Sequence, residues 1–312
     1  MTKLEPPKAI KTKLGFSGHE TFPFRYTWLK KAVDGVKKDS SVFSEESAIV
    51  DLGVGKNMVT SIKHWAFLAG LLHDTGKKIE ISPLGKNLLD DDGWDPYLED
   101  VGSLWILHWK ICTNIKKATT WFFAFNKLTQ IEFTKDHLVH EIVSFGEALN
   151  VKASPSIIAR DVDCFIRTYV PSRNAKLGLL EDSLDCPLTE LSLIQEVGQR
   201  GLYVFTRGPK RELPDEIFTY ALLEYWNGME QQTNALPFDE IAYGAGSPGL
   251  VFKLDEDSLS YRLDSLEKMT RGVLTYDETS GLRQVYRKKV LASDEFLRRY
   301  FEKSVAKRKH AA

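Results

Sequence analysis

Apolar positions in the first third of the chain follow helical spacing, interrupted by one short alternation. Residues 22–38 predict an amphipathic helix, and residues 44–52 predict a second, shorter one. After a glycine turn, the spacing over 56–71 predicts a third helix, and 74–78 predict a turn that leads into a strand. A further helix start follows. The order helix, turn, helix, hairpin, helix is that of a winged helix-turn-helix, with 56–71 as recognition helix and the hairpin as wing.

The middle of the chain is predicted to be almost entirely helical. Its apolar stripes cover 104–112, 119–128, 135–149 and 156–169. Aromatic residues recur in the first two stripes at the spacing of core positions. We therefore expect them to pack inside the protein rather than to stack on bases.

The last third of the chain repeats the predicted order of helices followed by a hairpin. Residues 215–226 and 257–269 predict helices, and two alternating stretches around 278–281 predict a hairpin. The predicted fold class is mainly α, of the α+β type. No low-complexity linker separates its parts, so we expect them to pack together. The predicted domains are an N-terminal winged-helix DNA-binding domain at 1–95, a helical domain at 96–190 and a C-terminal winged-helix-like domain at 191–312.

Composition places the chain among globular proteins. It has 312 residues, of which 43% are hydrophobic and 27% are charged. No apolar run approaches the roughly 18 residues that cross a membrane. The polar N-terminus lacks the apolar centre of a signal peptide. Three cysteines without a CxxC pair disfavour disulfide frameworks and thiolate zinc sites. We therefore expect a cytoplasmic protein with no membrane partner.

The net charge of −1 requires any DNA-binding surface to be local. The segment 283–309 carries ten Lys and Arg against three acidic residues, which suits either a phosphate footprint or a solvated helix face. In the first module, polar side chains fall on the turn, the helix and the wing tip, where such a module meets DNA. The predicted DNA contacts are Lys56, Asn57, Ser61, Lys63, Lys77 and Lys78.

The segment GHETFPFR, residues 18–25, combines an imidazole, a carboxylate and a guanidinium. Glu20 could bind a hard divalent cation, His19 could be a ligand or proton acceptor, and Arg25 could grip a phosphate. The alternative is a capped loop, in which His19 bonds to backbone and Glu20 pairs with Arg25 or a lysine. The residues alone leave both interpretations open.

Two other motifs are poor matches to known catalytic patterns. The histidine and aspartate of LLHDTGK suggest a metal phosphohydrolase, but that class needs further converging ligands and a following helix. A wing turn explains Asp74-Thr75-Gly76 more simply. In GVGKN, Val50 stands where a phosphate-binding loop needs its first glycine, and Asn57 follows the lysine.

Long segments of the chain resemble a bacterial family catalogued as a domain of unknown function. They include GFSGHETFPFRYTWLKKA, LGVGKNMVTSIKHWAFLAGLL, PLGKNLL, SPSIIARDVDCFIRTYVP, EDSLDCPLTELSLI, SPGLVFKLDEDSL and SGLRQVYR. The resemblance spans residues 14 to about 290. That family accompanies PAPS-reductase-like proteins in Ssp-type gene clusters for DNA phosphorothioation and phage defence.

The resemblance implies a DNA-nicking endonuclease, which hydrolyses one phosphodiester bond so that partner proteins can introduce sulfur. The implied partners are double-stranded DNA, a cysteine desulfurase, a PAPS-reductase-like protein and an ATPase; a homodimer is also considered. Nicking needs an attacking water, charge neutralisation and a protonated leaving oxygen. His19, Glu20 and Arg25 are the candidate catalytic residues, with Glu20 as ligand of a divalent metal such as Mg²⁺. The alternative is a non-catalytic winged-helix protein that recruits the sulfur-modification enzymes or regulates their genes.

Overall fold

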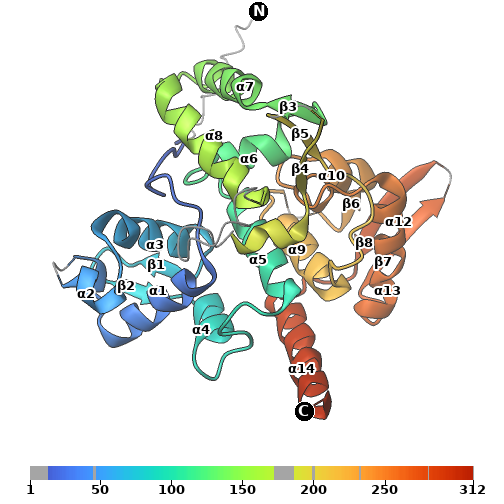
Figure 1. Ribbon diagram of the computed structural model, residues 1–312. Coiled ribbons are helices and arrows are strands. Elements are labelled where there is room, and N and C mark those ends of the chain that lie inside the picture. The colour runs from blue at the N-terminus through green and yellow to red at the C-terminus, as the bar shows by residue number, and fades with distance from the viewer. Residues whose placement is uncertain are drawn as a thin grey trace, which may run out of the picture.

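The computed structural model describes residues 13–44, 47–171, 186–198, 201–231, 233–279 and 281–311, with side chains up to residue 304. The protein is mainly helical and carries three small antiparallel sheets, so the predicted α+β class is confirmed (Figure 1). In the part of the chain that is described, no helix has the length and apolar character needed to span a membrane.

The N-terminal module follows the predicted order of elements. The first helix begins at Tyr26, later than expected, because Pro23 lies in the extended segment before it. The hairpin strands pair with Leu72 opposite Ile81. Ser82 caps the last helix by accepting from the Gly85 N–H at 2.9 Å. The assignment as a winged helix stays a prediction. The elements are α1 (Tyr26–Lys38), η1 (Val42–Ser44), α2 (Ala48–Leu52), α3 (Lys56–Leu68), β1 (Leu72–Asp74), β2 (Ile79–Ile81) and α4 (Pro83–Leu89).

The four helices expected in the middle of the chain are confirmed within a few residues. Two of them lie at the centre of the molecule, and Trp105, Trp109 and Trp121 are buried there. The expectation that these aromatic residues form core rather than base-stacking platforms is therefore correct. The helices are α5 (Val101–Cys112), α6 (Thr119–Asn126), α7 (Lys135–Ala148) and α8 (Pro155–Tyr169).

A three-stranded sheet in the middle of the molecule was not predicted. Its central strand is β5 (Leu202–Phe205), which pairs with β3 (Glu132–Thr134) on one side and β4 (Ile194–Glu196) on the other. Strands of three or four residues are too short to show a period in the sequence. The sheet joins residues from both sides of the predicted boundary at 190/191.

The C-terminal part contains the predicted helix over 215–226 and the predicted hairpin, with two differences. The helix expected over 257–269 is two helices that meet at Ser265, and a third strand joins the hairpin through the pair Leu236 and Val285. The elements are η3 (Pro187–Leu191), α9 (Asp215–Asn227), β6 (Ala235–Pro237), α10 (Phe238–Tyr243), α11 (Pro248–Val251), α12 (Glu256–Asp264), α13 (Leu266–Met269), β7 (Leu274–Thr279), β8 (Leu282–Arg287) and α14 (Asp294–Ala311).

One connected cluster of buried apolar side chains runs from Phe24 to Phe301. The C-terminal helix α14 packs against the segment between α4 and α5, since Phe301 stacks on Trp94 at 4.9 Å and Tyr300 donates to Asp100 at 2.6 Å. The expectation that the parts pack together is therefore confirmed, whereas the three-domain division stays a prediction. The polar N-terminus and the side chains of Lys307, Arg308 and Lys309, three of the basic tail residues, lie outside the described residues.

Candidate active site

The segment around His19 is a strained loop before α1. Ser17, Glu20 and Thr21 have φ values of 61°, 47° and 66°, and Gly18 has a φ of 94°. Residues other than glycine adopt this left-handed region at a cost of roughly 1–3 kcal/mol, so surrounding contacts must hold the loop in place. Figure 1 shows the segment running between α8 and α3. Backbone strain of this kind is concentrated at functional sites.

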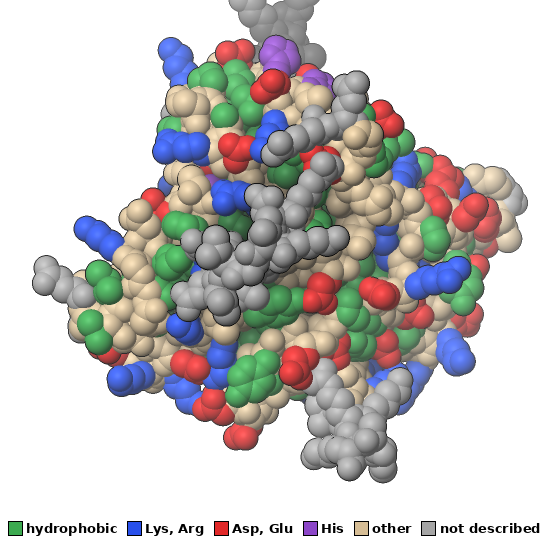
Figure 2. Space-filling model, in the orientation of Figure 1, with side chains coloured by type: hydrophobic (Ala, Val, Ile, Leu, Met, Phe, Trp, Pro, Cys, Tyr) green, Lys and Arg blue, Asp and Glu red, His purple; other side chains and the backbone are tan. Residues whose placement is uncertain are grey.

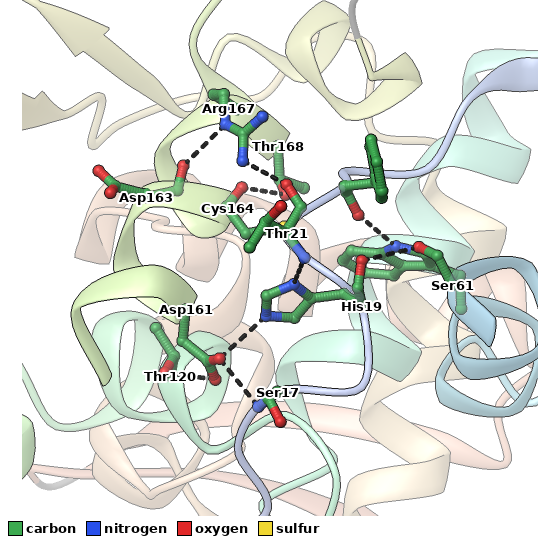
Figure 3. Close-up of polar contacts among 12 residues, drawn as sticks. Ser17, His19, Thr21, Ser61, Thr120, Asp161, Asp163, Cys164, Arg167 and Thr168 are labelled. Atoms are coloured by element: carbon green, nitrogen blue, oxygen red, sulfur yellow. Dashed lines mark hydrogen bonds and ion pairs between the residues drawn. The ribbon is translucent and has the colours of Figure 1, made fainter. Parts of the chain in front are cut away.

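The ring of His19 is buried and bonded at both nitrogens (Figure 3). Nδ1 accepts a hydrogen bond from the Thr21 N–H at 3.0 Å, so this atom carries the lone pair. Nε2 therefore carries the proton and donates it to Asp161 Oδ1 at 2.9 Å. Both ring nitrogens are occupied inside the protein. His19 in this arrangement offers no nitrogen to a phosphate on the surface.

Asp161 of α8 is the anchor of the loop. Its side chain is 2% exposed, and its Oδ1 atom also accepts from the Ser17 N–H at 2.8 Å. Oδ2 accepts from the Thr120 hydroxyl at 3.4 Å, a long hydrogen bond. A buried carboxylate without such partners would be strongly destabilising. The acid therefore holds two positions of the loop, Ser17 and His19, against α8 and α6.

The loop is also bonded to α3 and, at a second point, to α8. The Ser61 hydroxyl of α3 donates to the His19 carbonyl at 2.9 Å, and the Trp65 indole N–H donates to the Phe22 carbonyl at 2.8 Å. On the other side, the Arg167 guanidinium of α8 donates to the Thr21 carbonyl. These contacts clamp the loop between the predicted DNA-facing helix and the helical middle of the chain.

The three candidate catalytic residues occupy different environments. Glu20 is exposed at the apex of the loop, and no Lys or Arg forms an ion pair with it within the described residues. Arg25 is half-buried, with its guanidinium carbon 5.4 Å from the centroid of the Trp28 ring. It lines a groove of about 670 Å³ that also includes Lys31 and Gly55. The capped-loop interpretation is therefore correct for His19, which is hydrogen-bonded to the backbone. It does not hold for Glu20, whose side chain is exposed to solvent.

The predicted DNA contacts fall into an exposed group and one buried residue. Lys56 and Asn57 are exposed in the first turn of α3, and Lys63 is half-buried two turns later. Ser61 is fully buried, so its predicted contact with bases is not met; its hydroxyl holds the loop instead. On the hairpin, Lys77 and Lys78 are exposed. Lys78 also pairs with Glu80 at 3.1 Å, an exposed pair of small energetic weight.

Charge on the rest of the visible surface is mixed (Figure 2). On the right of the view, over α12 and the β7–β8 hairpin, acidic and basic side chains lie among one another. These elements also carry an ion pair between Glu256 and Arg283 at 2.9 Å. The predicted second winged-helix region therefore shows no continuous basic surface on this face.

His64 of α3 packs against the strained loop. Its ring centroid lies 6.0 Å from that of His19, and a side chain at Gly18 would place its Cβ 2.6 Å from His64 Nδ1. Burial lowers the pKa of His64 to about 4, with smaller contributions from His19 and Lys117. The imidazole is therefore neutral at physiological pH, which suits a ring wedged beneath the loop.

Comparisons with known proteins assign the chain to a family. Residues 16–301 match the family described as "Protein of unknown function (DUF4007)". The chain belongs to this family. A crystal structure of magnesium ion-bound SspB is 30% identical in sequence, with 95% of this chain and 96% of that chain covered and a TM-score of 0.79. A crystal structure of SspB is 29% identical, with 96% and 98% covered and a TM-score of 0.79. No curated protein sequence matches significantly. The resemblance stated from the sequence is confirmed.

One carboxylate of the loop, that of Glu20, is open to solvent and could serve as a metal ligand. Among the residues that the structure describes, no three His, Cys, Asp or Glu side chains are grouped to hold an ion. Mg²⁺ is usually bound by one or two carboxylates, with water and substrate phosphate as the remaining ligands. Glu20, exposed and without an ion-pair partner among the described residues, fits that role. Asp161 does not, because its oxygens are occupied by the loop and Thr120.

The residues that hold this DUF4007 loop were not singled out from the sequence. Asp161 lies on the apolar face of α8, three residues after Ile158 and four before Phe165, both of which are buried. A carboxylate on such a face must find a buried partner, and this was the available signal. For Arg167 there was no comparable signal, because an exposed arginine in the last turn of a helix is ordinary.

Proposed function

We propose that this protein is a DNA-nicking endonuclease that acts in DNA phosphorothioate modification and phage defence. Membership of the DUF4007 family and 30% identity to SspB over 95% of the chain support this assignment. The structural observation that carries it is the placement of Glu20. This exposed carboxylate directly follows His19 in the sequence. The His19 carbonyl accepts a hydrogen bond from the Ser61 hydroxyl of α3 at 2.9 Å, so Glu20 lies beside the helix that is predicted to face DNA. The substrate would place the protein in the bacterial cytoplasm.

In the proposed complex, the duplex lies along the exposed start of α3 and the β1–β2 turn. Lys56, Lys63 and Lys77 contact phosphates and set the position of the backbone, while Asn57 reaches base edges. Those contacts bring one phosphodiester to the loop. Arg25, in its groove beside Gly55, neutralises charge on a neighbouring phosphate.

Glu20 has the central chemical role in this proposal. When bound by Glu20 and the phosphate, Mg²⁺ would stabilise the charge that develops as a water oxygen attacks phosphorus. One P–O ester bond breaks, and the departing oxygen takes up a proton from solvent. Both ring nitrogens of His19 are hydrogen-bonded inside the protein, so this residue would not contact the attacking water or the phosphate. It is a positioning residue, because its bonds to Asp161 and Thr21 fix the backbone on both sides of Glu20.

Relaxation of supercoiled plasmid tests this assignment. The purified protein should produce open circles with Mg²⁺ and none with a chelator. Glu20→Gln should lower the rate by about 100-fold or more, since it removes a group that acts on the reacting phosphate. Glu147→Gln, an exposed change on α7, is the matched control and should nick at the normal rate. Normal nicking by Glu20→Gln would exclude this residue from the chemistry.

A second candidate function is that of a non-catalytic winged-helix protein that recruits sulfur-modification enzymes or regulates their genes. It is favoured by the lack of a three-ligand cluster among the described residues, since many metal nucleases hold their ions with several carboxylates. Retarded migration of plasmid without any open circles would support it. The assay is repeated with a cysteine desulfurase, a PAPS-reductase-like protein and an ATPase of the same pathway. Nicking only in their presence would make the endonuclease partner-dependent.

A further inference from the structure

A second site lies away from the strained loop, in a cavity of about 300 Å³. It is formed by the end of α6, the residues that lead into β3, the end of β5, and α11 with the turn that follows it. Its volume is at the lower end of the range for small-molecule sites. Phe205, Leu250 and Leu254 supply apolar wall, and Tyr243 adds a second aromatic ring. A small organic molecule therefore fits its size and surface.

Three basic residues line this cavity, namely Lys127, Arg207 and Lys253, and no Asp or Glu is among its described lining residues. The nearest acidic residues in sequence have other contacts. Asp255 caps α12 by accepting from the Ser258 N–H at 2.8 Å, and Glu256 accepts from Arg283 at 2.9 Å. Glu256 also accepts from the hydroxyl of Tyr243, and both carboxylates lie close enough to Arg207 to interact with its charge. The charge of Arg207 is therefore partly balanced, whereas Lys127 and Lys253 form no ion pair among the described residues.

Lys253 is the unusual member of this group. It is 9% exposed, and its backbone is held at a φ of 53° in the left-handed region. Its ammonium donates to the Phe125 carbonyl at 2.8 Å and lies 4.2 Å from the centroid of the Phe205 ring. Burial lowers the pKa of this amine to about 7. A buried ammonium with one carbonyl partner and no carboxylate is costly, and an anion in the cavity would stabilise it.

We propose that this cavity binds a small organic phosphate of about mononucleotide size. Three cationic side chains suit the double charge of a phosphate monoester, and the apolar and aromatic walls suit an attached base or ring. This site is independent of the proposed nicking chemistry, because none of its lining residues belongs to the loop, α3 or the β1–β2 hairpin.

Calorimetric titration of the full chain with AMP, adenosine and inorganic phosphate tests the proposal. AMP should bind saturably, and at least about tenfold more tightly than either of the other two. Arg207→Ala should weaken AMP binding by about tenfold or more, and Lys253→Met should do the same if it folds. The matched control is Arg211→Ala, an exposed arginine of the same segment that does not line the cavity. Lys56→Ala, on the predicted DNA surface, should also leave AMP binding unchanged.

Three results would overturn this assignment. The first is absence of saturable AMP binding up to about 10 mM, the weak end of the range for specific ligands. The second is equal affinity for AMP and inorganic phosphate, which would remove the organic part of the ligand. The third is an unchanged affinity in Arg207→Ala, a variant that shortens an exposed side chain and whose folding is checked by its thermal unfolding. Each result can occur in a protein that nicks DNA normally.

Discussion

His19 Nε2 and Asp161 Oδ1 lie 2.9 Å apart, although 142 residues separate them in the sequence. Both side chains are 2% exposed. The pair joins the segment before α1 to the middle of α8, and Ser17 adds a second bond to the same carboxylate at 2.8 Å. Because Glu20 follows His19 directly, the direction of its side chain depends on this buried contact.

Replacing Asp161 by alanine should destabilise the protein by about 2–4 kcal/mol. The change leaves the buried ring N–H of His19 and the partly buried N–H of Ser17 without their acceptor, and unpaired buried donors are costly. Urea unfolding measures the effect. Asp161→Asn keeps an oxygen acceptor of the same shape and should lose less than half as much stability. Equal losses in the two variants would show that the hydrogen bonds do not hold the loop.

Gly18→Ala should destabilise the protein by about 1–3 kcal/mol and lower nicking in the plasmid assay. The new Cβ would meet His64 Nδ1 at 2.6 Å, and the φ of 94° is strained for any residue with a side chain. Gly55→Ala is the matched control, since its φ is −68° and nothing lies within 4 Å of its Cβ position. A thermal shift that is the same for both variants would contradict the close approach at Gly18.

The free energy of unfolding should fall as the pH drops from about 6.5 towards 4. His64 has its pKa lowered to about 4 in the folded protein, so the unfolded chain binds a proton below about pH 6.5 while the folded chain does not. Stability is then lost at a rate of up to about 1.4 kcal/mol per pH unit for this group. Urea unfolding at several pH values between these limits measures the slope.

The contribution of His64 to this slope can be separated from that of other histidines. His108 is buried and has its pKa lowered to about 3, so it adds a loss of the same sign in wild type and variant alike. His64→Gln should therefore flatten the profile only in part. A profile that is unchanged by His64→Gln would show that this ring is not held neutral beneath the loop.

Lys56→Ala should weaken binding to all duplex sequences by a similar factor. A lysine at the exposed start of α3 contacts phosphate rather than base, so its loss should reduce the slope of log affinity against log salt by about 0.9. Mobility shifts with two unrelated sequences over a range of salt give this slope. The control is Lys268→Ala, an exposed lysine in α13. A loss confined to one sequence would assign Lys56 to base recognition instead.

Local patterns in the sequence were sufficient for the helices. The helices α5 to α8 and α9 occur where apolar spacing predicted them, because their buried stripes repeat with the helical period over several turns. The sheet β3-β5-β4 was missed, since its strands are three or four residues long and their partners lie far apart in the chain. The break of the helix over 257–269 at Ser265 was missed for a related reason, because the apolar stripe continues across it to Leu266.

The sequence by itself determined the helical class, the family and the chemical groups of the opening loop, because these depend on residue types at short spacing. Tertiary structure decided which of those groups face inward. It buried His19 and Ser61, left Glu20 exposed, and brought Asp161 to the loop. These outcomes depend on how α3 and α8 pack on the two sides of the loop. A hydrogen bond between residues 142 positions apart does not affect the local spacing of apolar residues, so the sequence pattern could not predict it.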